Sequence, residues 1–137
     1  MKRITLLFYF TFVSLVSLSA QSIQSSTIEW NSISVFEAQQ GVLTDESARI
    51  VSSPGEIKWY NKNDVIQKIF SISGSSGSWT NVAVAGEIIF NVSYESNSGV
   101  IQFSKSMNAT KIRIHLLNEQ DSPIYEFTIA NINILEP

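Results

Sequence analysis

The stretch GEIIFNVSYESNSGVIQFS, residues 86–104, determines the fold class that we expect for this chain. From Ile88 to Tyr94 every second side chain is large and apolar or aromatic, and the side chains between them are mostly polar. A period of two residues is typical of a β-strand that buries one face. A second alternating segment follows after a short polar interruption, so the stretch predicts an antiparallel hairpin.

The turn of this hairpin is expected at Ser96–Gly99, where small polar residues and a glycine gather. The apolar faces of the two strands coincide when Tyr94 lies opposite Ile101 and Val92 lies opposite Phe103. A loop of two or four residues gives this match, because a slip of one residue would turn one strand inside out.

A second hairpin is expected immediately downstream. Alternation over Ile112–Leu116 predicts one strand, Glu119–Ser122 predicts the loop, and alternation over Tyr125–Ile129 predicts the next strand. After Ala130 the apolar positions shift by one residue to Ile132, which indicates a bulge or a corner.

The first half of the domain contains shorter predicted strands. The apolar phase changes after Trp30, which indicates a bend, and Asp64–Gln67 fits a strand better than a helix because β-branched residues follow Asp64. We expect Gly74–Ser78 to be a loop. The whole pattern predicts seven to nine strands in a single small antiparallel all-β domain, either a meander barrel or a two-sheet sandwich.

The N-terminal segment, residues 1–20, has the features of a secretory signal peptide. Lys2 and Arg3 precede an apolar run from Ile4 to Leu18, and cleavage is expected between Ala20 and Gln21. The alternative is an uncleaved membrane anchor, but an apolar run of about 15 residues is shorter than the roughly 20 that a spanning helix needs. We therefore expect residues 21–137 to form the mature domain, in a secreted or periplasmic location.

Composition excludes several classes of function. The chain has no cysteine, so no disulfide, thiolate metal site or cysteine nucleophile is possible. Removing Lys2 and Arg3 from the nine basic residues leaves seven against twelve acidic residues, a net charge of −5. An acidic domain is a poor candidate for binding nucleic acid or anionic lipid. With a single histidine, His115, a zinc or copper site is not expected, and we predict no cofactor.

No catalytic group of residues is evident. If Leu116 lies opposite Tyr125, His115 faces Glu126 on the outer face, which we interpret as an exposed cross-strand pair rather than a proton relay. Gly74–Gly77 lacks the lysine of a phosphate-binding loop, and Asn118–Asp121 does not match a calcium-binding loop. The acidic residues lie mostly in predicted turns or on polar faces, so no catalytic pair of carboxylates is assigned.

Four aromatic residues in the first half are the candidate ligand-binding residues: Trp30, Trp59, Tyr60 and Trp79. Trp59 and Tyr60 are adjacent, so on a strand they point to opposite faces. An exposed member of the set near Asn61, Asn63 or Asn81 would resemble a sugar-stacking platform, whereas an inward Trp59 would line an apolar cavity. The alternative is ordinary packing in the core.

The sequence therefore leaves three hypotheses for function. The first is a non-enzymatic exported domain that binds an extracellular or envelope partner, a glycan or a small apolar ligand. The second is a small hydrolase or isomerase that uses carboxylates, with Asp64, His115 and Glu126 as the residues to mutate. The third is a structural or adhesin-like subunit that self-associates through a sheet edge at Asn131–Leu135.

Overall fold

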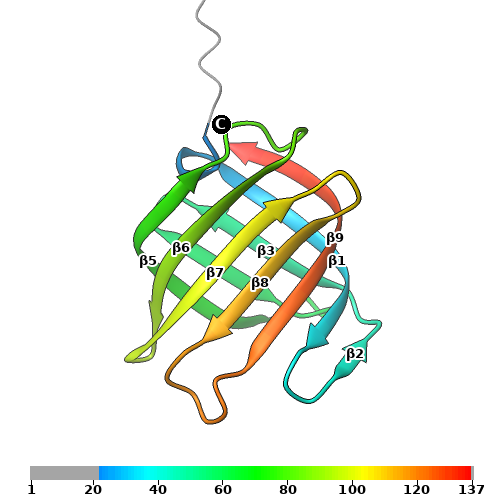
Figure 1. Cartoon of the computed structure of the whole chain (residues 1–137), viewed down its shortest axis with the longest axis vertical. Coiled ribbons are helices and arrows are strands. Elements are labelled where there is room, and N and C mark those ends of the chain that lie inside the picture. Colours follow the sequence, from blue (N-terminus) through cyan, green and yellow to red (C-terminus); the bar gives the residue numbers. More distant parts are fainter. Residues whose placement is uncertain (1–21, 137) are drawn as a thin grey trace, which may run out of the picture.

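The computed structural model describes residues 22–136, which form nine antiparallel strands and one short 3-10 helix, η1 (Figure 1). The signal peptide expected at residues 1–20 lies outside this range. The elements are η1 (Ile23–Ser25), β1 (Thr27–Glu37), β2 (Val42–Thr44), β3 (Ala48–Ser53), β4 (Glu56–Tyr60), β5 (Ile66–Ser78), β6 (Gly86–Tyr94), β7 (Asn97–Lys105), β8 (Thr110–Leu116) and β9 (Ile124–Glu136).

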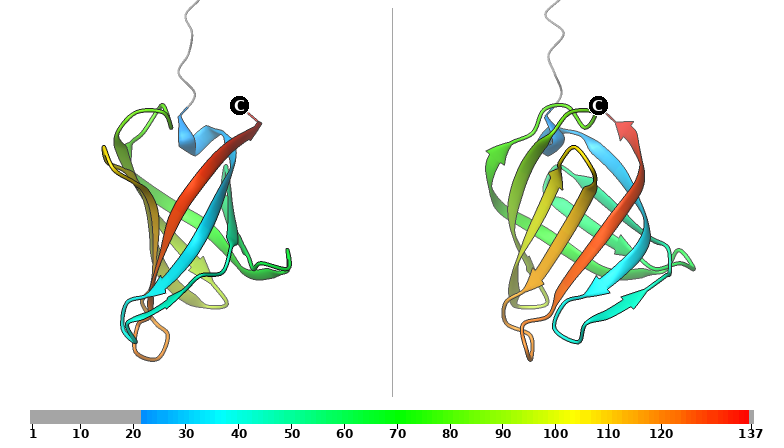
Figure 2. Two further views of the ribbon diagram at one scale, coloured as in Figure 1. Left: turned by 90° about the vertical axis from the view of Figure 1, so that its right-hand side faces the viewer. Right: turned by 45° about the vertical axis from the view of Figure 1, so that its right-hand side comes forward.

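The sheet closes into an eight-stranded barrel with β2 as an additional strand. Each strand from β3 to β9 pairs with the next along the chain, and β9 pairs back onto β1. The first half of β1 pairs with β3, and its last residues, Val35–Glu37, pair with β2. The β1–β2 hairpin therefore extends below the barrel, as the views in Figure 2 show. The all-β prediction is confirmed, and of the two predicted architectures the barrel is the one found.

Two predicted bends occur where β1 and β9 pair with each other. The β1–β9 register shifts around Ser32 and Ser34, and Asn31 and Ser32 pair with Asn131 and Ile129. Ala130 is therefore the extra residue of a bulge, as the shift of apolar phase predicts. Bulges increase local twist, and this twist helps β1 and β9 to close the barrel.

The predicted faces are correct, but the predicted position of the first turn is not. Tyr94 pairs with Asn97, so the turn consists of Glu95 and Ser96, which both have positive φ angles of 45° and 69°. With this two-residue loop the predicted apolar side chains of both strands still face inward, but the strands pair in a different register from the predicted one. Gly99 lies inside β7, where a Cβ atom would be 3.0 Å from the carbonyl oxygen of His115, so glycine permits close strand packing there.

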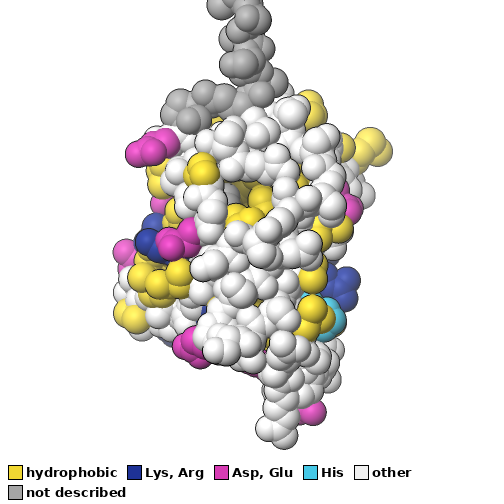
Figure 3. Space-filling view, turned by 90° about the vertical axis from the view of Figure 1, so that its left-hand side faces the viewer, with side chains coloured by type: hydrophobic (Ala, Val, Ile, Leu, Met, Phe, Trp, Pro, Cys, Tyr) yellow, Lys and Arg dark blue, Asp and Glu magenta, His cyan; other side chains and the backbone are white. Residues whose placement is uncertain are grey.

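The segment predicted as a loop, Gly74–Ser78, is the end of β5 and pairs with β6 from Asn91 to Glu87. The prediction was wrong because cross-strand pairing overrides the weak strand preference of serine and glycine. β5 extends past β4, whose pairing with β5 ends at Ser71. Figure 3 shows a hollow with hydrophobic side chains at its base on the β5 side of the molecule.

The predicted self-association edge at Asn131–Leu135 has a partner along one side. Asn131, Asn133 and Ile134 of this segment pair with β1. Pairing of β9 with β8 ends at Ile129, so the other side of the segment extends past β8. Ile134 and Leu135 are each about half exposed.

The two ends of the barrel differ in their elements. One end is covered by η1, with the buried Ile23 donating its backbone N–H to Trp79 O at 3.2 Å. We call this the capped end. The opposite end carries the β1–β2 turn (38–41), the β4–β5 loop (61–65), the β6–β7 turn (95–96) and the β8–β9 loop (117–123), and we call it the mouth. The mouth is the lower end of the barrel in Figure 1.

Candidate functional site

Two of the four candidate aromatic residues belong to the core near the capped end. Trp30 is fully buried, its ring centroid lies 4.9 Å from that of Phe103, and its Nε1 donates to Ser52 Oγ at 2.9 Å. Trp79 is 2% exposed, and its Nε1 donates to the carbonyl oxygens of Asn81 and Val84. With their polar atoms paired and their rings enclosed, both tryptophans serve packing.

Trp59 and Tyr60 point to opposite faces, as their adjacency predicts. Tyr60 lies outside the barrel, where the Arg49 guanidinium covers its ring at 4.0 Å from the centroid. Trp59 points inward at the mouth and is partly buried against the core. Of the four candidates, Trp59 is the one placed beside a hollow at the mouth.

A hollow at the mouth has a volume of about 720 Å³, within the range of small-molecule sites, and we call it the large hollow. It lies between the β1–β2 hairpin and the β8–β9 loop, which are joined by a hydrogen bond from Gln39 Nε2 to Ser122 O at 2.9 Å. Its lining is mostly polar: Glu37, Gln39, Gln40, Val42, Thr44, Glu119, Gln120, Asp121, Pro123 and Tyr125.

A pair of aromatic rings separates this hollow from a smaller one. Trp59 and Tyr125 meet edge to face with centroids 5.1 Å apart, and Trp59 also meets Phe127 at 5.1 Å. Tyr125 lines the large hollow, and Trp59 lines a neighbouring hollow of about 220 Å³. The two hollows share Thr44. The mouth thus combines a rigid aromatic pair with a rim of amides, carboxylates and hydroxyls.

A cluster of titratable side chains holds the β8–β9 loop in place. Tyr94 Oη donates to Glu119 Oε1, and Lys68 Nζ lies 3.3 Å from the same oxygen. The hydrogen bond from Tyr94, with the nearby Lys68 ammonium, lowers the pKa of Glu119. Burial and the bond to Glu119 raise the pKa of Tyr94 to about 12. Glu119 therefore stays ionised, and the loop that bears it is fixed over the mouth.

The pKa of Tyr125 is also shifted by its surroundings. Burial raises the pKa of Tyr125, and the negative charges of Glu119 and Glu37 add to the shift. Tyr125 therefore presents a neutral phenol, which can both donate and accept a hydrogen bond in the hollow.

Most of these mouth residues are not among the candidates that the sequence indicates. Tyr125 was assigned to an inward face and Glu119 to a loop, but their meeting with Glu37 and Lys68 depends on barrel closure. One sequence feature could have indicated this site. Tyr125 and Phe127 are two aromatic residues on the same inward face of a predicted strand, and the preceding loop is rich in carboxylates and amides.

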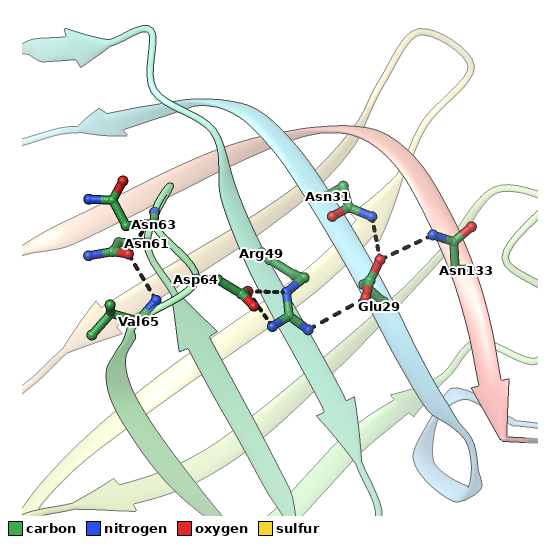
Figure 4. Close-up of polar contacts among 8 residues, drawn as sticks. All are labelled: Glu29, Asn31, Arg49, Asn61, Asn63, Asp64, Val65 and Asn133. Carbon is green, nitrogen blue, oxygen red and sulfur yellow. Dashed lines mark hydrogen bonds and ion pairs between the residues drawn. The ribbon is translucent and has the colours of Figure 1, made fainter.

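A polar network occupies the outer face beside the mouth (Figure 4). Glu29 accepts hydrogen bonds from Asn31 at 2.9 Å and Asn133 at 3.1 Å, and Arg49 joins Glu29 to Asp64. The two amide hydrogen bonds, followed by the charge of Arg49, lower the pKa of Glu29. The predicted turn residue Asn61 accepts from the backbone N–H groups of Asn63 and Val65, which fixes the β4–β5 loop.

The predicted pairing of His115 with Glu126 is wrong. Ile114, not Leu116, lies opposite Tyr125, and His115 lies opposite Ile124. Leu116 N–H bonds to Pro123 O, and the loop covers residues 117–123 instead of the predicted Glu119–Ser122. Glu126 instead forms an ion pair with Lys111 at 2.8 Å on the outer surface.

Within residues 22–136, no group of three or more His, Cys, Asp or Glu side chains is arranged to hold a metal ion. In the same range, no helix is long and apolar enough to cross a bilayer. Comparison with protein-family models, with curated proteins and with solved structures finds no match to this chain. Functional inference therefore depends on the site itself.

Proposed function

We propose that this protein is an exported, non-enzymatic domain that binds a saccharide at the mouth of its barrel. The observation that carries the proposal is the Trp59–Tyr125 pair, flanked by two hollows with polar lining. The C–H faces of a sugar ring pack against aromatic rings, and its hydroxyl groups suit planar amide and carboxylate partners. The N-terminal charge and apolar pattern of residues 1–20 supports export.

The chemistry of Glu119 favours binding over hydrolysis. A glycosidase needs one carboxyl group that keeps its proton near neutral pH, which requires a raised pKa. The pKa of Glu119 is lowered because Tyr94 and Lys68 stabilise its ionised form. This carboxylate suits hydrogen-bond acceptance and loop positioning rather than proton donation.

A panel of neutral mono- and oligosaccharides, titrated against the mature domain by calorimetry, tests the proposal. We expect Kd values between the micromolar and millimolar ranges, corresponding to about 4–8 kcal/mol. Tyr125→Leu keeps apolar volume but removes the aromatic face and the hydroxyl, so it should weaken binding at least about tenfold.

Tyr60→Leu is the matched control, because Tyr60 lies outside the barrel under Arg49. It should leave monosaccharide affinity unchanged, because the large hollow at the mouth includes neither Tyr60 nor Arg49. Equal losses in the two variants, or no saccharide binding at millimolar concentrations, would contradict the proposed function.

The hollow on the β5 side supports a second candidate, binding of a small apolar molecule. Its base is hydrophobic (Figure 3), whereas the mouth is lined mostly by polar residues. Native mass spectrometry of the domain purified from its own exported fraction would detect such a ligand as a reproducible added mass that organic solvent removes. An unaltered mass together with saccharide binding would leave the mouth as the functional site.

A further inference from the structure

We infer that the ligand is an extended neutral oligosaccharide that crosses the rim of the mouth onto the outer face. The inference rests on the proposed function and specifies its substrate class. Its basis is a pair of hollows, of about 220 and 210 Å³, which share four lining residues: Ser47, Ala48, Asn61 and Lys62. The inner hollow reaches Trp59, and the outer hollow reaches Asn31.

The rim between these hollows is not a continuous hydrogen-bonded sheet. Pairing of β1 with β3 ends at Ser32 and Ala48, and β1 pairs with β2 only from Val35 onward. The β2–β3 connection (45–47) and the β4–β5 loop (61–65) face each other across this position.

The ion pair between Glu46 and Lys62, 2.7 Å long, spans the two segments. Both of its side chains are about half exposed, so the pair contributes little to stability and hydroxyl groups can replace it. The rim is therefore weakest where the two hollows adjoin.

The outer hollow offers polar groups that are already fixed in position. Asn31 Nδ2 donates to Glu29 and to Asn131 Oδ1 at 2.8 Å, and Arg49 is held by Asp64 and Glu29. Groups that are fixed before binding lose little entropy when a ligand arrives. The positive charge of Arg49 is matched by two carboxylates, so the hollow suits uncharged hydroxyl groups rather than an anionic sugar.

The three hollows together follow a path from the large hollow, past Thr44 and Trp59, to Asn31. A monosaccharide occupies only the aromatic part of this path. A longer chain also contacts the rim and the outer hollow, so affinity should rise with length until the chain reaches the outer face.

The structure provides a matched pair of variants for the test. Asn31 and Asn131 are joined by one hydrogen bond, so Asn31→Ala and Asn131→Ala both remove it. Only Asn31 lines the outer hollow. Asn31→Ala also removes the hydrogen bond to Glu29, so thermal unfolding of both variants records how far their stabilities differ.

The experiment measures calorimetric affinities of wild type, Asn31→Ala and Asn131→Ala for one neutral sugar and its linear oligomers of increasing length. We expect wild-type affinity to rise about tenfold or more from the monosaccharide to the long oligomers. Asn31→Ala should lose about fivefold to tenfold for long oligomers and nothing for the monosaccharide, and Asn131→Ala should match wild type.

The possible failures are distinguishable. If affinity does not depend on oligomer length, or if the two asparagine variants have equal effects, the oligosaccharide does not cross the rim. Binding at the mouth is still supported in that case if monosaccharide binding depends on Tyr125. Absence of binding at every length would overturn the proposed function as well.

Discussion

The two ends of this barrel are built from the same alternating strands but contain different chemistry. At the capped end, η1, Trp30 and Trp79 enclose apolar side chains, and Gly86 admits the Trp79 ring. At the mouth, Lys68 and Glu119 turn inward with Tyr94, and loops surround polar hollows. From this difference we expect stability to depend mainly on the capped end and, under the proposed function, recognition to depend on the mouth. Stability and binding should therefore respond to different substitutions.

The largest effect is expected from Trp30→Ala at the capped end. It removes a fully buried ring and the partner of Ser52 Oγ, so the free energy of unfolding should fall by about 3–5 kcal/mol. Trp59→Ala, at the partly exposed mouth, should cost about 1–3 kcal/mol. Urea denaturation followed by circular dichroism measures both. If Trp59→Ala lowers the free energy of unfolding more than Trp30→Ala does, the mouth and not the capped end is the main source of stability.

A pair of glycine substitutions makes the same comparison on the backbone. A Cβ atom on Gly86 would lie 2.2 Å from Trp79 Cδ1, so Gly86→Ala should destabilise by about 2–3 kcal/mol through overpacking. Gly41 in the β1–β2 turn has open space but a φ of +66°, so Gly41→Ala should cost only about 1 kcal/mol. Thermal or urea unfolding measures both variants, and a greater loss of stability for Gly41→Ala than for Gly86→Ala would contradict this expectation.

Tyr94→Phe tests whether the cluster at the mouth positions the β8–β9 loop. Loss of the hydrogen bond to Glu119 should reduce stability by about 1–2 kcal/mol. It should also speed amide hydrogen exchange within residues 117–123 more than elsewhere in the barrel. Uniform acceleration across the barrel would indicate a general loss of packing instead of local loosening.

The pH dependence of stability should show the same cluster. The pKa of Tyr94 is raised from 10.0 to about 12 in the folded state, so folding favours its neutral form. Its contribution to stability is complete below the unfolded pKa and is lost as pH rises through the folded pKa. Between about pH 10 and 12, wild type should lose more stability than Tyr94→Phe. Urea denaturation at each pH measures the free energy of unfolding of both proteins. If the two proteins lose the same amount of stability over this range, Tyr94 is not the group responsible.

The smallest effect is expected at the rim. Glu46→Gln removes an exposed ion pair and should change the free energy of unfolding by less than about 1 kcal/mol. Glu46 lines the smaller hollow beside Trp59 but not the large hollow, so saccharide affinity should change by less than about threefold. Unfolding and calorimetry on the same sample check both values.

The strand faces of this barrel could be predicted from sequence because a period of two directly reports burial. Ile88, Phe90 and Val92 are all 1–3% exposed, and the bend at Ala130 was visible as a phase shift. Turn positions were less accessible, since Glu95 and Ser96 adopt left-handed conformations that more often belong to glycine or asparagine. The serine and glycine residues at 74–78 concealed the end of a strand, because their own strand preference is weak and pairing with β6 overrides it.

The site could be predicted only in part, for a topological reason. Trp59 is one of four aromatic candidates from the sequence, and its adjacency to Tyr60 shows that the two rings point to opposite faces but not which of them points inward. Tyr125, Glu37 and Glu119 come from different strands and loops, and closure of β9 onto β1 brings them together. No local spacing in the sequence encodes that meeting.

NMR can show which end of the barrel binds a ligand, because the indole N–H resonances of the three tryptophans can be followed during titration with a neutral oligosaccharide. Trp59→Phe assigns the Trp59 resonance by its disappearance. We expect the Trp59 resonance to shift progressively, whereas the resonances of Trp30 and Trp79, enclosed at the capped end, should stay in place. Shifts at Trp30 or Trp79 with an unmoved Trp59 would contradict the division of the barrel into a stabilising end and a binding end.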